Sequence, residues 1–76
     1  MSVSRILYID DDIDLLNVYA NYIEDWGYQV DVINSPIKAL SRLKEKTQYD
    51  VLLVDYNMPE MSGVDFISEV LKRWSV

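Results

Sequence analysis

The chain has 76 residues, half of them hydrophobic and 26% charged, which is the composition of one small globular domain with a thin core. Its 13 acidic and 7 basic residues give a net charge of −6. We expect no nucleic-acid partner, because most of such a surface would repel a phosphate backbone. The absence of cysteine and histidine excludes disulfides, thiolate metal sites and imidazole chemistry.

The start of the chain and its apolar runs argue against export and membrane insertion. Residues 1–5, MSVSR, lack the apolar core of a signal peptide. The longest apolar run is four residues, whereas a membrane-spanning helix needs roughly 20. We therefore expect a cytoplasmic protein that does not contact a membrane.

The first half of the chain predicts a strand, a helix and a second strand. Residues 5–10, RILYID, contain the continuous apolar run Ile6, Leu7, Tyr8 and Ile9 before the aspartate, which is typical of a strand covered on both faces. A helical spacing of apolar residues begins at Ile13 and predicts a helix that ends at Gly27. Its apolar stripe is Leu16, Tyr19, Ala20, Ile23 and Trp26. Residues 28–33 alternate between apolar and polar side chains, which indicates a half-exposed edge strand.

The second half predicts a helix, a strand and a third helix. Ser35 followed by Pro36 is typical of an N-cap and a first helical residue. This helix has the apolar stripe Ala39, Leu40 and Leu43. Residues 50–55, DVLLVD, form the next apolar strand, and Ser62 with Asp65 resembles a capping box. The expected stripe of the third helix is Ile67, Val70, Leu71 and Trp74.

Three strand–helix units in succession predict an α/β fold with parallel strands in the order 2-1-3. In such sheets ligands bind at the carboxyl ends of the strands, where the order reverses between strands 1 and 3. Both apolar strands end there on acids, Asp10 and Asp11 after the first and Asp55 after the third. Their mutual repulsion favours a hard divalent cation such as Mg²⁺. Asp12 is expected to be a helix N-cap, and Asp14 a first-turn residue favoured by the helix dipole.

Three segments resemble the receiver domain of bacterial two-component response regulators. They are RILYIDDD, GYQVDVINSPIKAL and LLVDYNMPEMSG, which occur in the order and spacing of that family. The resemblance covers residues 5–74. It implies a flavodoxin-like, CheY-like doubly wound parallel sheet whose complete strand order is 2-1-3-4-5.

The resemblance also implies roles for individual residues. Asp55 corresponds to the phosphoacceptor, and the protein groups that hold Mg²⁺ would be Asp11, Asp55 and the backbone carbonyl of Asn57, with Asp10 acting through water. The turn after the acceptor would be shaped by Met58, Pro59 and Gly63. The module would accept a phosphoryl group from a sensor histidine kinase and would not itself be an enzyme.

A complete receiver continues into a fourth strand that ends in Ser or Thr and a fifth strand followed by Lys. Neither follows residue 74 here. We interpret residues 1–76 as the N-terminal part of a single receiver domain, and we expect this form to be deficient in phosphotransfer and switching.

Two other functions are consistent with parts of the sequence. A phosphatase of the haloacid-dehalogenase type would use Asp10 and Asp12, but its motif needs Thr or Val where this chain has Asp14, and it leaves residues 52–63 unexplained. A half-domain that assembles with itself, without phosphotransfer, is the stronger alternative. Residues 50–55 would then be an exposed apolar edge, and the apolar stripe of the first helix would be partly uncovered. We expect a homodimer through this edge and this helix.

Overall fold

A computed structural model describes residues 4–45 and 49–74, with the side chain of Trp74 outside the description. The elements in chain order are β1 (Arg5–Ile9), α1 (Ile13–Asp25), β2 (Gln29–Ile33), α2 (Pro36–Glu45), β3 (Val51–Val54) and α3 (Gly63–Trp74). In this part of the chain the strands form one parallel sheet in the order β2-β1-β3. The predicted α/β fold and its strand order are confirmed. None of the described helices is both long enough and apolar enough to cross a bilayer.

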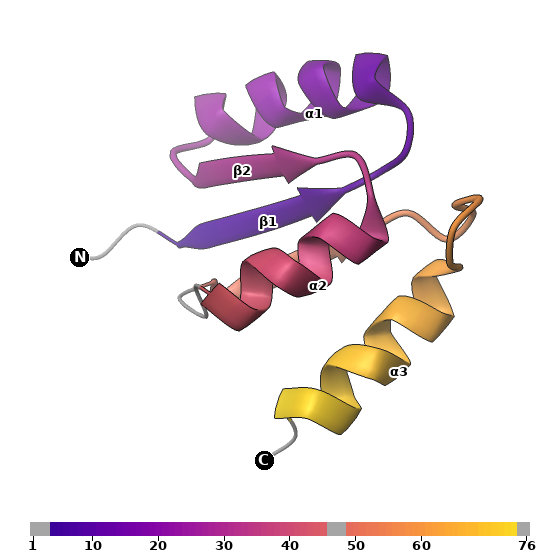
Figure 1. Ribbon diagram of the computed structural model, residues 1–76. Coiled ribbons are helices and arrows are strands. Elements are labelled where there is room, and N and C mark those ends of the chain that lie inside the picture. Colours follow the sequence, from indigo (N-terminus) through magenta and orange to yellow (C-terminus); the bar gives the residue numbers. More distant parts are fainter. Residues whose placement is uncertain (1–3, 46–48, 75–76) are drawn as a thin grey trace.

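The helices cover the two faces of the sheet unequally. Figure 1 shows α1 on one face and α2 with α3 on the other. The main core lies on the α2 and α3 face, because β1 and β3 present apolar side chains there and both helices turn apolar residues toward them. Its buried members are Leu7, Ile9, Ala39, Leu40, Leu43, Met58 and Phe66. The α1 face is thinner, with Leu16 and Ala20 as the buried residues of that helix.

The helix ends follow the capping pattern of the sequence. The Asp12 carboxylate accepts a hydrogen bond from the Leu15 N–H at 3.1 Å, which makes Asp12 the N-cap of α1. Gly27 follows α1 with φ +97°, a conformation that side chains disfavour. The Ser62 hydroxyl accepts from the Asp65 N–H at 3.1 Å at the start of α3. The two N-caps lie in strand-to-helix turns at one edge of the sheet, and Gly27 lies in a helix-to-strand turn at the other.

A polar network closes the opposite edge of the sheet. The Tyr49 hydroxyl donates to Asp31 Oδ2 at 2.5 Å, and the Arg5 guanidinium lies 3.3 Å from the same oxygen. The Arg5 N–H donates to the Asp50 carboxylate at 2.8 Å. Burial raises the pKa of Tyr49, and its hydrogen bond to Asp31 adds to the increase. The network fixes the chain just before β3 against β1 and β2.

The buried face of α3 differs from the predicted stripe. Phe66 is fully buried and Val70 packs beside it, whereas Ile67 and Leu71 are 37% and 60% exposed. Phe66 and Val70 are four residues apart and share one helix face, which points at the core between α2 and the sheet. Ile67 lies toward the free edge of β3, where the described chain supplies no further strand to cover it. The expectation that Ile67 and Leu71 are core residues was therefore wrong.

We predict that Phe66→Leu lowers the free energy of unfolding by about 1 kcal/mol or more, because it leaves a cavity in the main core. Leu71→Ala removes a mostly exposed side chain and should change the free energy of unfolding by less than about 0.5 kcal/mol. Urea unfolding followed by circular dichroism compares the two variants with the wild type. Equal losses in both variants would show that α3 packs on the face that the sequence pattern favoured.

Candidate functional site

The register between β1 and β3 brings the acids of the two strands together. Ile9 lies opposite Val54 in the parallel ladder, so the next residues, Asp10 and Asp55, leave the sheet side by side. The Asp55 N–H donates to the Ile9 carbonyl at 2.9 Å, which extends the ladder to the acid itself. Asp55 is therefore presented from a rigid strand end.

Three carboxylates meet at this edge. Oxygen atoms of Asp10, Asp11 and Asp55 all lie within 4.8 Å of one another. Asp10 is buried, Asp55 is half-buried and Asp11 is exposed, so the cluster runs from the interior of the protein to solvent. Two unit charges at about 4 Å repel by about 1 kcal/mol in water and about 4 kcal/mol near a protein surface. The cluster therefore destabilises the fold unless positive charge is bound there.

Protein donors hold both carboxylate oxygens of Asp10. The Asp12 N–H donates to Oδ1 at 3.0 Å, and the Tyr8 hydroxyl lies 3.4 Å from Oδ2, a long hydrogen bond. Burial raises the pKa of Tyr8, and the nearby negative charge of Asp10 adds to this effect. These contacts fix the orientation of Asp10 and leave Asp11 and Asp55 to face an incoming ligand.

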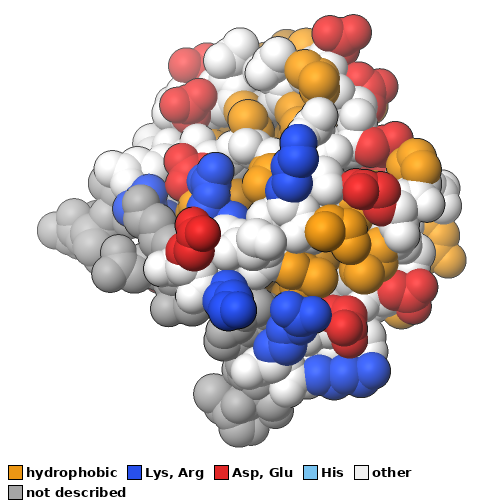
Figure 2. Space-filling view, viewed as in Figure 1, with side chains coloured by type: hydrophobic (Ala, Val, Ile, Leu, Met, Phe, Trp, Pro, Cys, Tyr) orange, Lys and Arg blue, Asp and Glu red, His pale blue; other side chains and the backbone are white. Residues whose placement is uncertain are grey.

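The residues present fit a divalent cation. The side-chain atoms of the cluster that could bind a metal ion are all carboxylate oxygens, which are the ligands that Mg²⁺ prefers. Within residues 4–45 and 49–74, the ion pairs of Lys and Arg go to Asp31 and Glu69, and none reaches the cluster. Figure 2 shows most Lys and Arg side chains over α2 and α3, away from the rim where acids gather.

The loop between β3 and α3 passes beside the cluster. Asn57 is exposed in this loop, two residues after Asp55, while Met58 turns inward and is 7% exposed. A Cβ atom on Gly63 would lie 2.4 Å from the backbone oxygen of Asp55. Glycine at position 63 therefore lets the start of α3 pack directly on the backbone of the acid.

The sequence interpretation missed two contacts, one within the acidic cluster and one in the loop beside it. Tyr8 was treated only as an apolar strand residue, although it lies two positions before Asp10 and therefore on the same face of β1. This spacing could have indicated the contact. Glu60 was not singled out, yet its carboxylate accepts a hydrogen bond from the Ser35 hydroxyl at 2.6 Å. Nothing in the local pattern of the sequence pairs residues that are 25 positions apart.

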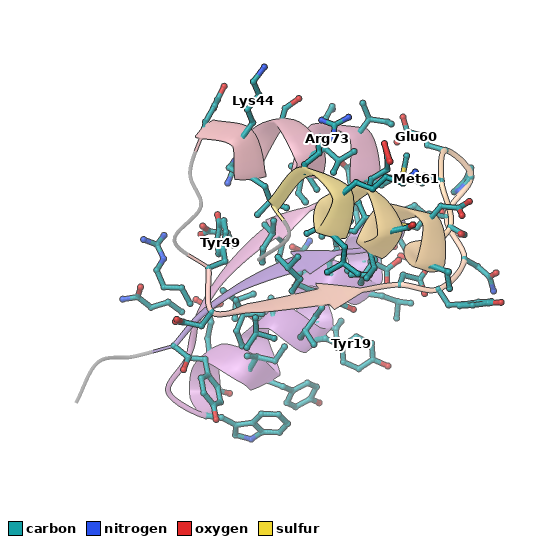
Figure 3. All side chains as sticks on the ribbon, turned by 90° about the horizontal axis from the view of Figure 1, so that it is seen from below. Tyr19, Lys44, Tyr49, Glu60, Met61 and Arg73 are labelled. Atoms are coloured by element: carbon teal, nitrogen blue, oxygen red, sulfur yellow. The ribbon has the colours of Figure 1, made fainter. Side chains whose placement is uncertain are left out.

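An apolar groove begins at the acidic cluster and continues along the sheet. It has a volume of about 660 Å³ and runs between α1 and β3. Its lining includes Tyr8, Asp10 and Asp55 at one end and the aromatic residues of α1 along its length. They are Tyr19 and Tyr22 of the helix itself and Trp26, its C-cap. Figure 3 shows Tyr19 projecting from α1 beneath β3. Tyr19 and Trp26 belong to the apolar stripe predicted for the first helix, yet both are exposed, with Trp26 at 72%.

The fold and the acidic edge are those of a signalling receiver module, and comparison with known proteins assigns the family. The sequence model described as "Response regulator receiver domain" matches residues 6–76. The chain therefore belongs to the family of response regulator receiver domains. This confirms the resemblance that the three sequence segments suggested.

Individual relatives support this assignment. The chain is 33% identical over 70 residues to the transcriptional regulatory protein CpxR homolog of Haemophilus influenzae. The aligned stretch covers 92% of this chain and 30% of that protein. The chemotaxis protein CheY4 of Vibrio cholerae superposes with a TM-score of 0.88 at 27% identity, over 97% of this chain and 61% of that one. The response regulator TrrA of Thermotoga maritima, in complex with Mg²⁺–BeF, superposes with a TM-score of 0.87 at 26% identity. The match covers 95% of this chain and 62% of that one.

We predict that Gly63→Ala disturbs the site, because the new methyl group cannot fit without moving the Asp55 backbone. The free energy of unfolding should fall by about 1–3 kcal/mol, as in other overpacked positions. Ser68→Ala, on an exposed turn of the same helix, is the matched control and should leave stability nearly unchanged. Urea unfolding measures both variants, and a Gly63→Ala protein as stable as the control would contradict the close packing.

Proposed function

We propose that this chain is a phosphoacceptor module of a two-component response regulator, which binds Mg²⁺ and carries Asp55 as the phosphoacceptor residue. The observation that carries the proposal is the convergence of Asp10, Asp11 and Asp55 within 4.8 Å at the carboxyl edge of the sheet. The structure of the related TrrA is a complex with Mg²⁺–BeF, which supports Mg²⁺ as the bound cation. Asp11, Asp55 and the Asn57 carbonyl would hold the ion directly, and Asp10 would act through water.

Each residue has a distinct part in the proposed transfer. An Asp55 carboxylate oxygen forms the new bond to phosphorus as the bond from phosphorus to the donor nitrogen of a phosphohistidine breaks. Bound Mg²⁺ would neutralise the charge on the phosphoryl oxygens. Asp10, held by Tyr8 and the Asp12 N–H, keeps its orientation throughout. The donor would be a sensor histidine kinase, and the module accepts the group without turning over a substrate of its own.

The spacing of side chains within the acidic cluster favours this function over the phosphatase alternative. Asp12, which a phosphatase of that type would need as a catalytic acid, caps α1 through the Leu15 N–H. Asp55, which that mechanism leaves unused, lies in the cluster with Asp10. The expected deficiency of this form in phosphotransfer and switching stays a prediction.

We predict that the protein binds Mg²⁺ or Mn²⁺ and that Asp55→Asn weakens binding by about tenfold or more, because it removes an anionic ligand. Tryptophan fluorescence or calorimetric titration measures the affinity. Asp65→Asn, an exposed acid in the first turn of α3, is the matched control and should bind like the wild type. Equal affinities of wild type and Asp55→Asn would overturn the ligand assignment.

A second function, self-assembly of the chain, is favoured by its exposed apolar surface. Within the described residues β3 pairs only with β1, and Val51 and Leu53 are 41% and 37% exposed at its free edge. The groove beside α1 lies on one side of this edge, and a hollow of about 320 Å³ lies near it toward α3. We propose that a second copy occupies this surface. A two-fold pairing through β3 and α1 would cover the same apolar residues on both copies.

We predict that the 76-residue polypeptide forms dimers at micromolar concentration in sedimentation equilibrium. Leu53→Lys places a charge at the free edge and should shift the population to monomers. Asn21→Lys adds the same charge to an exposed position of α1 that does not line the groove, and it should leave the dimer intact. A wild-type protein that stays monomeric at high concentration would contradict the proposed assembly.

A further inference from the structure

The loop after β3 is tied to the start of α2 by a short hydrogen bond. The Ser35 hydroxyl donates to Glu60 Oε1 at 2.6 Å. This distance lies in the range of about 2.5–2.7 Å for a hydroxyl that donates to a carboxylate, which is roughly twice as strong as a neutral hydrogen bond. Ser35 is 7% exposed, so the bond is anchored on a buried residue. Figure 3 shows Glu60 beside the amino-terminal end of α2.

The anchor is rigid because Ser35 is also the N-cap of α2. Its hydroxyl oxygen accepts from the Lys38 N–H at 3.3 Å, while its proton is donated to Glu60. A hydroxyl has one proton and two lone pairs, so both contacts can be made together. The next residue, Pro36, is among the fully buried side chains. The backbone of α2 therefore determines where the Glu60 carboxylate is held.

The bond acts on the segment that contains Asn57. On the near side the Asp55 N–H is fixed to the Ile9 carbonyl, and Met58 inserts into the main core. On the far side Met61 packs only partly against that core. In the described part of the chain, the Ser35–Glu60 contact is the one hydrogen bond or ion pair that links residues 56–62 to any residue before β3. Its loss would leave the loop held by packing and by its own turn.

We propose that Glu60 is a positioning residue, which uses its hydrogen bond to Ser35 to hold the loop so that the Asn57 carbonyl faces the acidic cluster. The inference rests on the proposed function, since it assigns Glu60 to the same cation site. Glu60 does not contact the cluster itself and acts only through the loop backbone. The side chain at position 60 would therefore tune cation affinity without supplying a ligand.

Two measurements on Glu60→Ala test the proposal. Without metal, amide hydrogen exchange of Gly63, whose N–H donates to the Tyr56 carbonyl across the loop at 2.9 Å, should become about tenfold faster, because local opening of the loop is easier. Mg²⁺ affinity should fall by about fivefold, less than the 10- to 100-fold loss typical of groups that contact a metal ligand directly. Urea unfolding should stay near the wild-type value, which separates positioning from general destabilisation.

Glu60→Gln keeps an acceptor oxygen for Ser35 and should retain most of the loop protection and most of the affinity. Glu24→Ala removes a distant exposed acid and should change neither measurement. In a Ser35→Ala background, Glu60→Ala should have no further effect, since the bond is already absent. Equal losses of Mg²⁺ affinity in Glu60→Gln and Glu60→Ala would overturn the proposal, because they would show that only the charge of Glu60 matters. Unchanged amide exchange of the loop in Glu60→Ala would also overturn it. A wild type that binds no Mg²⁺ would refute the proposed function, while the metal-free exchange would still decide the role of Glu60.

Discussion

The parallel register of β1 with β3 is the constraint on which the rest of this structure depends. Because Ile9 lies opposite Val54, the next residues, Asp10 and Asp55, lie side by side at the end of the sheet. A slip of one residue would move one acid about 3.3 Å along the other strand and turn its side chain to the opposite face. Such a slip would also expose Leu7 and Ile9, which are fully buried. The hydrophobic core and the acidic cluster are therefore determined by the same pairing.

The three acids of the cluster differ in burial, and this difference gives them different roles. A buried carboxylate is costly unless donors compensate for the lost water, and Asp10 has the Asp12 N–H and the Tyr8 hydroxyl. Asp11 remains exposed and Asp55 half-buried, so these two can still exchange solvent for a ligand. The interior acid is fixed during folding, whereas the outer two keep the freedom that binding requires.

The sequence was sufficient to predict the order of the elements, the strand order and the meeting of Asp10, Asp11 and Asp55. These follow from periodicity and from the rule that parallel strands end at one edge. The rotation of α3 was not predictable in the same way, because Phe66, Ile67, Val70 and Leu71 make the helix apolar on two flanks. The packing of α3 against α2 and the sheet decides which flank is buried. The Ser35–Glu60 contact joins two loops, whose approach depends on how both helices pack.

The last turns of α2 and α3 carry Arg42, Lys44, Lys72 and Arg73, at the opposite edge of the sheet from the acids. The molecule is therefore an electric dipole as well as a net anion. Its extents are 31 × 29 × 18 Å, whereas the Debye length at physiological ionic strength is about 8 Å. Salt thus screens the basic helix ends from the acidic edge, and a cation approaching that edge meets an almost purely negative potential. At low ionic strength the two ends would instead orient the whole molecule in the field of a charged partner.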